Sequence, residues 1–123
     1  MGATVLHSNS IHFVKEVGVH RVLFAMHRKE GMSVEEFIAH YRDVHIPITR
    51  RFPGLREYDV YPVPAGGDGP DAFAVMAFDS QEDFDAALAA DEFKEAMEDS
   101  ATFVGHAESY VVDHIAVVAP VKA

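Results

Sequence analysis

VHRVLFAMHRKEGMSVEEFIAHYRDVH, residues 19–45, is the stretch of the sequence that decides the fold. Its first nine residues are β-branched, aromatic and almost continuously apolar, which is typical of a central strand covered on both faces. Ser33 is followed three residues later by a glutamate, a capping box that predicts the start of a helix. Phe37, Tyr41 and His45 then follow at i, i+4 and i+8, so their side chains lie along one face of that helix. The stretch therefore predicts a strand, a turn and an amphipathic helix.

The residues after His45 predict the end of this helix and a β-hairpin. Pro47 lacks a backbone donor, and we expect the helix to end or kink just after His45. Residues 55–63 alternate apolar and polar side chains, as a half-exposed or edge strand does, and residues 72–78 are almost entirely apolar. The glycine-rich loop between them makes the pair a hairpin with a long connection.

The remainder of the chain predicts a second helical region and a last strand. Ser80 begins a helix that breaks near Ala90 and restarts with Asp91 as a second N-cap, and residues 108–118 form the final strand. The order β-α-β-β-α-β with right-handed crossovers predicts an α+β, ferredoxin-like fold. In that fold a four-stranded antiparallel sheet carries both helices on one face.

The second face of this sheet predicts self-association. Two helices cover only one face, yet the strands that begin near Val19 and Ala72 are apolar on both alternations. An apolar face of several hundred Å² does not stay exposed in a monomer, so we expect a second copy to pack sheet against sheet as a homodimeric α+β barrel. Residues 1–18 are weakly patterned and predict an N-terminal arm. Residues 19–123 predict one domain.

Composition excludes several classes of protein. The chain has 123 residues, no cysteine and a formal net charge of -10, which excludes disulfides and argues against nucleic-acid or membrane binding. Nine acidic residues and one lysine lie within residues 79–99, and we interpret them as the solvated face of a helical region. No apolar run approaches the roughly 18 residues of a membrane span, and no signal peptide is visible. We expect a cytoplasmic protein.

Several spaced elements coincide within RKEGMSVEEFIAHYRDVHIPITRRFPGLREY, residues 28–58. They are the capping-box helix start with Glu-Glu-Phe, then Tyr41, His45 and Pro47, then Pro-Gly-Leu leading into an Arg/Tyr strand. With this pattern the segment resembles the EthD family of dimeric α+β barrel proteins. The resemblance implies a small cofactor-free domain that dimerises through its sheets, with a pocket between helices and sheet to which the helix histidine contributes. Similar folds serve isomerases, polyketide cyclases and monooxygenases, so the fold leaves the reaction open.

His45 is the leading candidate for acid/base chemistry, with Tyr41 beside it. A histidine titrates near neutrality and can both take and give a proton, and unsatisfied carbonyls at a helix end would favour its charged form. Tyr41, one turn earlier, is placed to donate a hydrogen bond to a substrate oxygen. The alternative is that both residues only complete the core and bond to backbone carbonyls.

Five further residues are candidates for binding a small neutral or anionic organic molecule. Phe37, Phe24 and Phe84 supply apolar pocket walls. His27 closes the first strand, where it would lie at the pocket mouth, and His114 lies in the last strand. The arginines at positions 42, 50, 51 and 56 form the main cluster of basic residues. This cluster would bind an anionic substrate, contact a partner subunit or only face solvent.

We expect no metal and no cofactor. The eight histidines include no HExxH or His-x-His pattern. His40 and His45 are five residues apart, which separates them by about 140° around an α-helix, so they cannot easily chelate one ion.

Three functions stay open. The first is a cofactor-free isomerase, cyclase or lyase in which His45 shuttles a proton. The second is a non-catalytic binding or accessory protein that uses the same pocket. The third is a monooxygenase-like or heme-handling protein with His45 or His114 as the axial ligand, although no accompanying pattern supports it.

Overall fold

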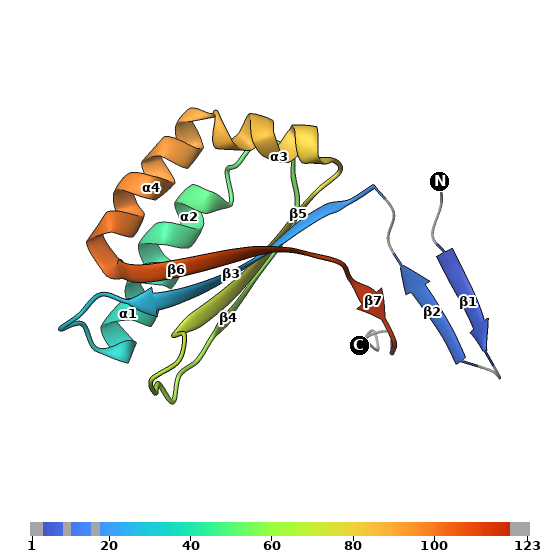
Figure 1. Ribbon diagram of the computed structural model, residues 1–123. Helices are drawn as coiled ribbons and strands as arrows, with labels where there is room; N and C mark the ends of the chain where they lie inside the picture. Colours follow the sequence, from blue (N-terminus) through green and yellow to red (C-terminus); the bar gives the residue numbers. More distant parts are fainter. Residues whose placement is uncertain (1–3, 9–10, 16–17, 119–123) are drawn as a thin grey trace.

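The computed structural model describes residues 4–8, 11–15 and 18–118 (Figure 1). Its main sheet has four antiparallel strands in the order β4-β5-β3-β6. The strands are β3 (His20–Arg28), β4 (Leu55–Pro62), β5 (Ala72–Phe78) and β6 (Val104–Val112). The strand that comes first along the domain is thus central, which is the ferredoxin-like arrangement that the sequence predicts.

The helices occupy one face of this sheet (Figure 1). They are α1 (Val34–His40), a π-helical segment η1 (Tyr41–His45), α2 (Ile46–Thr49), α3 (Gln81–Leu88) and α4 (Asp91–Phe103). The predicted capping box is present: the Glu36 amide donates to Ser33 Oγ over 3.1 Å, and the Ser33 amide donates to Glu36 Oε1 over 3.0 Å. The predicted break near Ala90 is also present, although Ala90 is the N-cap and Asp91 the first helical residue. Among the helices of the described residues, none is both long and apolar enough to cross a bilayer.

Of the two outcomes predicted for Pro47, an end or a kink of the helix just after His45, the end is wrong. The chain continues through η1 into α2, and the Ile46 amide donates to the carbonyl of Tyr41, five residues back. Pro47 therefore falls in the first turn of α2, where a helix does not need its backbone N–H. The wider turn absorbs the proline without breaking the helical path, and such turns are frequent at functional sites.

The last strand begins earlier than residue 108 and ends before residue 118. β6 starts at Val104, directly after α4, and a separate short strand β7 (Ile115–Ala116) follows it. Gly105 and Ala107 are poor strand formers, so the sequence hides the start of the strand. Val104 and His106 pair with Arg28 and His27 of β3, which fixes the strand start. Gly105 lies between them at a shift in the register, where a Cβ would lie 2.9 Å from the carbonyl oxygen of Arg28.

Two further strands lie within the predicted N-terminal arm. β1 (Thr4–Ser8) and β2 (Ile11–Lys15) pair as an antiparallel hairpin, and β2 also pairs with β7. These three strands make a small second sheet beside the main one (Figure 1). Residues 1–3, 9–10 and 16–17 of the predicted arm, and residues 119–123 of the predicted domain, lie outside the described residues.

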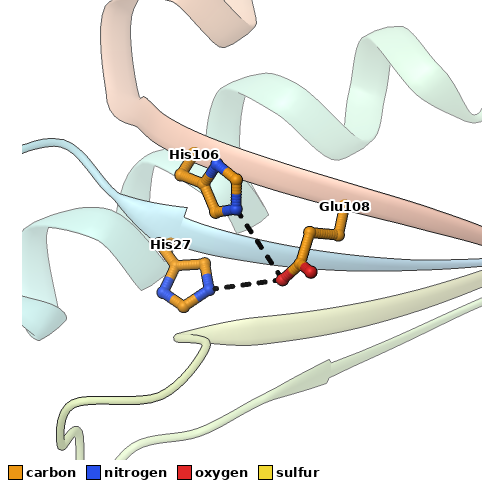
Figure 2. A group of neighbouring side chains, drawn as sticks. All are labelled: His27, His106 and Glu108. Carbon is orange, nitrogen blue, oxygen red and sulfur yellow. Dashed lines mark ion pairs between the residues drawn. The ribbon is translucent and has the colours of Figure 1, made fainter.

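The face of the main sheet opposite the helices is partly apolar; we call it the outer face. Alternation along β3 places Leu23, Ala25 and His27 on it. Figure 2 shows His27 on β3 beside two side chains of β6, His106 and Glu108, with all three pointing toward one another. No described helix covers the outer face (Figure 1).

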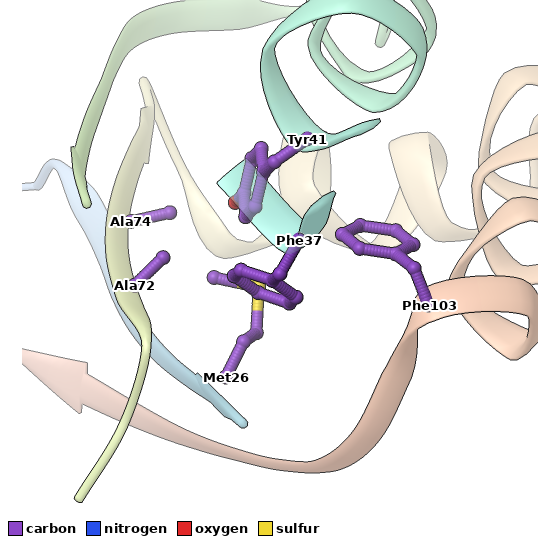
Figure 3. Packing of buried hydrophobic residues seen from close by; sticks show 6 residues of the cluster. All are labelled: Met26, Phe37, Tyr41, Ala72, Ala74 and Phe103. Atoms are coloured by element: carbon purple, nitrogen blue, oxygen red, sulfur yellow. The ribbon is translucent and has the colours of Figure 1, made fainter. Parts of the chain in front are cut away.

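The core lies between the helices and the other face of the sheet. Phe37 of α1 and Phe103 at the end of α4 are fully buried, with ring centroids 5.2 Å apart, and Met26 of β3 packs below them (Figure 3). Ala72 and Ala74 of β5 leave room for these large rings. This aromatic cluster supports η1 from beneath.

Candidate functional site

A cavity of about 470 Å³ lies between the helices and the sheet. Most of its wall is apolar: Phe24, Met26, Phe52, Ala74, Met76, Phe84, Leu88, Phe93, Ala96, Met97, Val104 and Ala107. Its lining also includes the polar residues Tyr41, His45, Thr49, Tyr58, Ser100, Glu108 and Ser109. An apolar cavity with a few converging polar groups is the usual form of a small-molecule site.

Four of the seven residues singled out from the sequence lie in this wall. Tyr41 and His45 come from η1, Phe24 comes from β3 and Phe84 comes from α3. The centroids of the Tyr41 and His45 rings are 5.4 Å apart and the rings meet edge to face. The structure therefore brings the two acid/base candidates and two of the aromatic candidates together.

The other three residues lie elsewhere. Phe37 is fully buried in the core and does not reach the cavity. His27 is turned to the outer face, because the odd-numbered residues of β3 point away from the helices. His114 lies in the exposed segment between β6 and β7. The sequence predicts pocket roles for these three, and their positions are outside the pocket.

His45 is buried, and its two ring nitrogens have different surroundings. The Nδ1–H group donates to Asp99 Oδ2 over 2.9 Å. Nε2 has no hydrogen-bond partner among the described residues. In that part of the chain, every fully buried side-chain nitrogen or oxygen has a partner, so Nε2 is not fully buried. Nε2 is therefore accessible from the cavity, whose wall includes His45. The carboxylate fixes the ring and presents one nitrogen to a ligand.

Asp99 is the functional candidate that sequence reasoning missed. Its carboxylate accepts hydrogen bonds from His45 Nδ1 and from His40 Nε2, the latter over 2.9 and 3.1 Å. Asp99 belongs to the acidic residues 79–99, which we interpret from the sequence as a solvated face. However, it lies three residues after Ala96 and four before Phe103, and both of these residues of α4 are fully buried. That spacing puts Asp99 on the inward side of the helix.

The expectation that His40 and His45 point apart is also wrong. It assumes the regular α-helical turn, whereas η1 has a wider one that ends at His45. As a result, two side chains five residues apart reach the same carboxylate.

Burial dominates the electrostatics of His45. It lowers the pKa of the imidazole below its ordinary value of 6.5, although Asp99 opposes the shift; His40 adds to it. The predicted preference for the charged form at a helix end does not apply, because the helical path continues past His45. The ring is neutral near pH 7, so Nε2 is an unprotonated acceptor suited to act as a base.

Tyr41 and Tyr58 supply neutral phenol groups beside His45. Burial is the main cause that raises the pKa of each, so both keep their protons under physiological conditions. The Tyr58 hydroxyl lies 2.7 Å from Thr49 Oγ1. The cavity wall therefore offers the hydroxyl groups of Tyr41, Thr49 and Tyr58 as well as an unprotonated imidazole.

The basic residues near the helix end do not line the cavity. Arg51 Nη2 lies 2.5 Å from Glu95 Oε1, Arg42 pairs with its neighbour Asp43, and the Arg56 guanidinium lies 3.7 Å from an Asp79 oxygen. Among the residues that the structure describes, no lysine or arginine contributes to the wall. These positions favour a neutral ligand over an anionic one.

Histidine and carboxylate atoms able to hold a metal ion converge outside the cavity. Among the described residues, His27, His106 and Glu108 form a group whose ligand atoms lie within 4.8 Å of one another. Glu108 is also at the rim of the cavity.

We expect Asp99→Asn to lower the pKa of His45 further, because the negative charge that favours the imidazolium is removed. An NMR titration of the ring nitrogens would measure this pKa; a higher pKa in the variant would refute this electrostatic assignment.

The lowered pKa of His45 also fixes the direction in which the stability of the fold depends on pH. Below about pH 6.5 the imidazole takes up a proton in the unfolded chain but stays neutral in the folded one. The contribution of His45 to the stability of the fold is therefore complete above about pH 6.5 and is lost as the pH falls through the folded pKa.

Comparison with known proteins gives a family model and a set of similar structures. The EthD domain model matches residues 29–107. An EthD family protein from Bacillus halodurans is 27% identical with a TM-score of 0.60, over 78% of this chain and 95% of that one. No curated protein matches.

Two other structures show the same fold. A protein from Shewanella oneidensis is 21% identical with a TM-score of 0.60, over 84% of this chain and 97% of that one. A dimeric protein of unknown function and ferredoxin-like fold from Bacteroides fragilis is 15% identical with a TM-score of 0.59, over 79% and 95%.

Proposed function

This chain belongs to the EthD family, and we propose that it binds a small neutral organic molecule in the cavity and moves a proton on it with His45. The observation that carries the proposal is the pairing of His45 Nδ1 with Asp99 at 2.9 Å while Nε2 is accessible from a mostly apolar cavity. A general base needs an unprotonated nitrogen, a fixed orientation and access to the substrate, and His45 has all three.

The reaction that fits these groups begins at a C–H bond next to a carbonyl. His45 Nε2 takes the proton, and the electron pair of the C–H bond moves toward the carbonyl oxygen to give an enolate. A hydroxyl from Tyr41 or Tyr58 donates a hydrogen bond to that oxygen as its charge develops. Asp99 stabilises the imidazolium that forms. Return of the proton at another atom completes an isomerisation, and loss of a leaving group completes an elimination, with no cofactor.

A non-catalytic binding protein is the second candidate. The mostly apolar wall supports it, because burial of an apolar ligand gives affinity without any proton transfer. The monooxygenase alternative gains no support from similar structures. A putative antibiotic biosynthesis monooxygenase from a Bacteroides species has a TM-score of 0.54, but at 15% identity the likeness concerns the fold alone.

We also propose that two copies pack through their outer faces. Leu23, Phe73 and Val75 are only half-buried there, and a similar structure from Bacteroides fragilis is described as dimeric. Light scattering in solution should give twice the chain mass of 13.6 kDa. A monomer at concentrations well above those in the cell would exclude this interface.

Proton exchange tests the catalytic proposal without knowledge of the natural substrate. The protein is incubated in D₂O with a panel of aryl ketones, 1,3-diketones and unsaturated lactones, and their α-hydrogens are followed by NMR. We expect at least one compound to raise the melting temperature and to exchange its α-hydrogens faster than in buffer. Compounds that stabilise the protein with neither exchange nor product would instead support the binding protein.

A further inference from the structure

A second cluster of titratable side chains lies on the outer face, on the side of the sheet away from the helices. His27 Nε2 lies 3.9 Å and His106 Nε2 lies 3.7 Å from the same oxygen, Glu108 Oε1. The two imidazole rings are tilted by 46° with centroids 5.3 Å apart. Figure 2 shows all three side chains directed toward one point.

The sheet itself produces this convergence. His27 and His106 are direct cross-strand partners in the β3–β6 pair, and Glu108 is two residues further along β6, so all three project from the same face. Two ligands come from one rigid strand and the third comes from its neighbour. The positions of the three Cβ atoms are therefore set by the register of the sheet and not by a loop.

Glu108 is oriented by one further contact. Tyr110, the next residue on the same face of β6, donates its hydroxyl hydrogen to Glu108 Oε2 over 2.9 Å. This bond occupies one carboxylate oxygen and leaves Oε1 facing the two histidines. Hydrogen bonds of this kind typically orient the carboxylates that bind metals.

We propose that His27, His106 and Glu108 bind a divalent transition-metal ion on the outer face, with Zn²⁺ as the best fit. Two imidazole nitrogens and one carboxylate oxygen are a common zinc ligand set, with ligand bonds of about 2.0–2.2 Å. A tetrahedral ion with such bonds needs ligand atoms roughly 3.4 Å apart. The two histidine–carboxylate separations of 3.7 and 3.9 Å approach that value, and all three ligand atoms lie within 4.8 Å of one another. A water molecule would take the fourth position.

The imidazole ligands also favour a transition-metal ion over Ca²⁺ or Mg²⁺. Imidazole favours zinc, copper, nickel and iron, whereas Ca²⁺ and Mg²⁺ require sets of oxygen ligands. The sequence conceals this site, because His106 and Glu108 form only a His-x-Glu pair and the third ligand comes from a strand about 80 residues earlier. The inference does not rest on the proposed proton transfer, which uses His45.

Calorimetric titration of the metal-stripped protein with Zn²⁺ alone tests the proposal. We expect one ion per chain, and His106→Ala should weaken binding by at least about tenfold, since loss of a ligand costs more than loss of an orienting contact. The His106 side chain is 64% exposed in the single chain, so its truncation leaves the core of that chain intact, and circular dichroism checks the fold. Glu108→Gln removes the charge of the third ligand and should weaken binding in the same way.

Two control variants locate the binding site. His114→Ala removes a histidine outside the cluster and should leave affinity within about twofold of the wild type. His45→Gln alters the other place where histidine and carboxylate meet, and it too should leave zinc binding in place. Unchanged affinity in both His106→Ala and Glu108→Gln, or loss of binding in His45→Gln alone, would overturn the proposal.

Discussion

His45→Gln should slow proton exchange on a bound ketone or lactone by about 10²–10⁴-fold, the usual contribution of a general base. Glutamine has a similar length and keeps an N–H group able to donate to Asp99, but it cannot accept a proton. Binding of the same compound should change little, because the apolar wall is intact. The measurement is the NMR exchange rate at saturating compound, with the melting temperature as the readout of binding.

The matched control for this variant is His114→Gln, which makes the same chemical change outside the cavity and should keep the wild-type rate. Tyr41→Phe should slow exchange less than His45→Gln, because the Tyr58 hydroxyl also lines the cavity and can still donate a hydrogen bond there. If His45→Gln and Tyr41→Phe both keep the wild-type rate, the assignment of proton transfer to this cavity is wrong.

Phe103→Ala should lower the free energy of unfolding by about 3–5 kcal/mol, the range for truncating a fully buried aromatic side chain. The Phe103 side chain is fully buried, and its ring centroid lies 5.2 Å from that of Phe37, 4.5 Å from His40 and 5.0 Å from His45. Its loss would leave a void directly beneath η1. Urea denaturation of the wild type and the variant gives the difference.

Val111→Ala is the control for Phe103→Ala. Val111 is 71% exposed on β6, and its truncation should change stability by no more than about 0.5 kcal/mol. A loss below about 1 kcal/mol in Phe103→Ala would contradict the central position of this ring in the core.

The sequence predicts the architecture well because the strong signals are local. The apolar run of β3, the capping box at Ser33 and the boundaries of β5 all follow from periodicity and cap chemistry. The start of β6 does not, because it is set by the pairing of Val104 and His106 with β3 on either side of a register shift at Gly105. Pairing between distant strands has no local sequence signal.

The candidate site is predicted in part for a similar reason. Tyr41 and His45 follow from helical spacing, but the wide turn that brings His40 beside His45 depends on how the chain accommodates Pro47. Strand alternation puts His27 on the same face of β3 as Leu23 and Ala25. It cannot say which face of the sheet the helices cover, and His27 lies on the opposite one.

Asp99 shows how charge composition can mislead. It is one of the nine acidic residues that give residues 79–99 their negative charge, and most of that stretch is exposed. Its side chain is instead only 12% exposed and holds His45 in place. Its spacing from the buried Phe103 carried more information than its charge.

The protonation state of the His45 ring tests the central claim most directly. A long-range ¹H–¹⁵N correlation spectrum near neutral pH distinguishes the two ring nitrogens. We predict a neutral ring with the proton on Nδ1, donated to Asp99, and with Nε2 unprotonated. A ring protonated at Nε2 near neutral pH, alone or together with Nδ1, would contradict the assignment of His45 as the base.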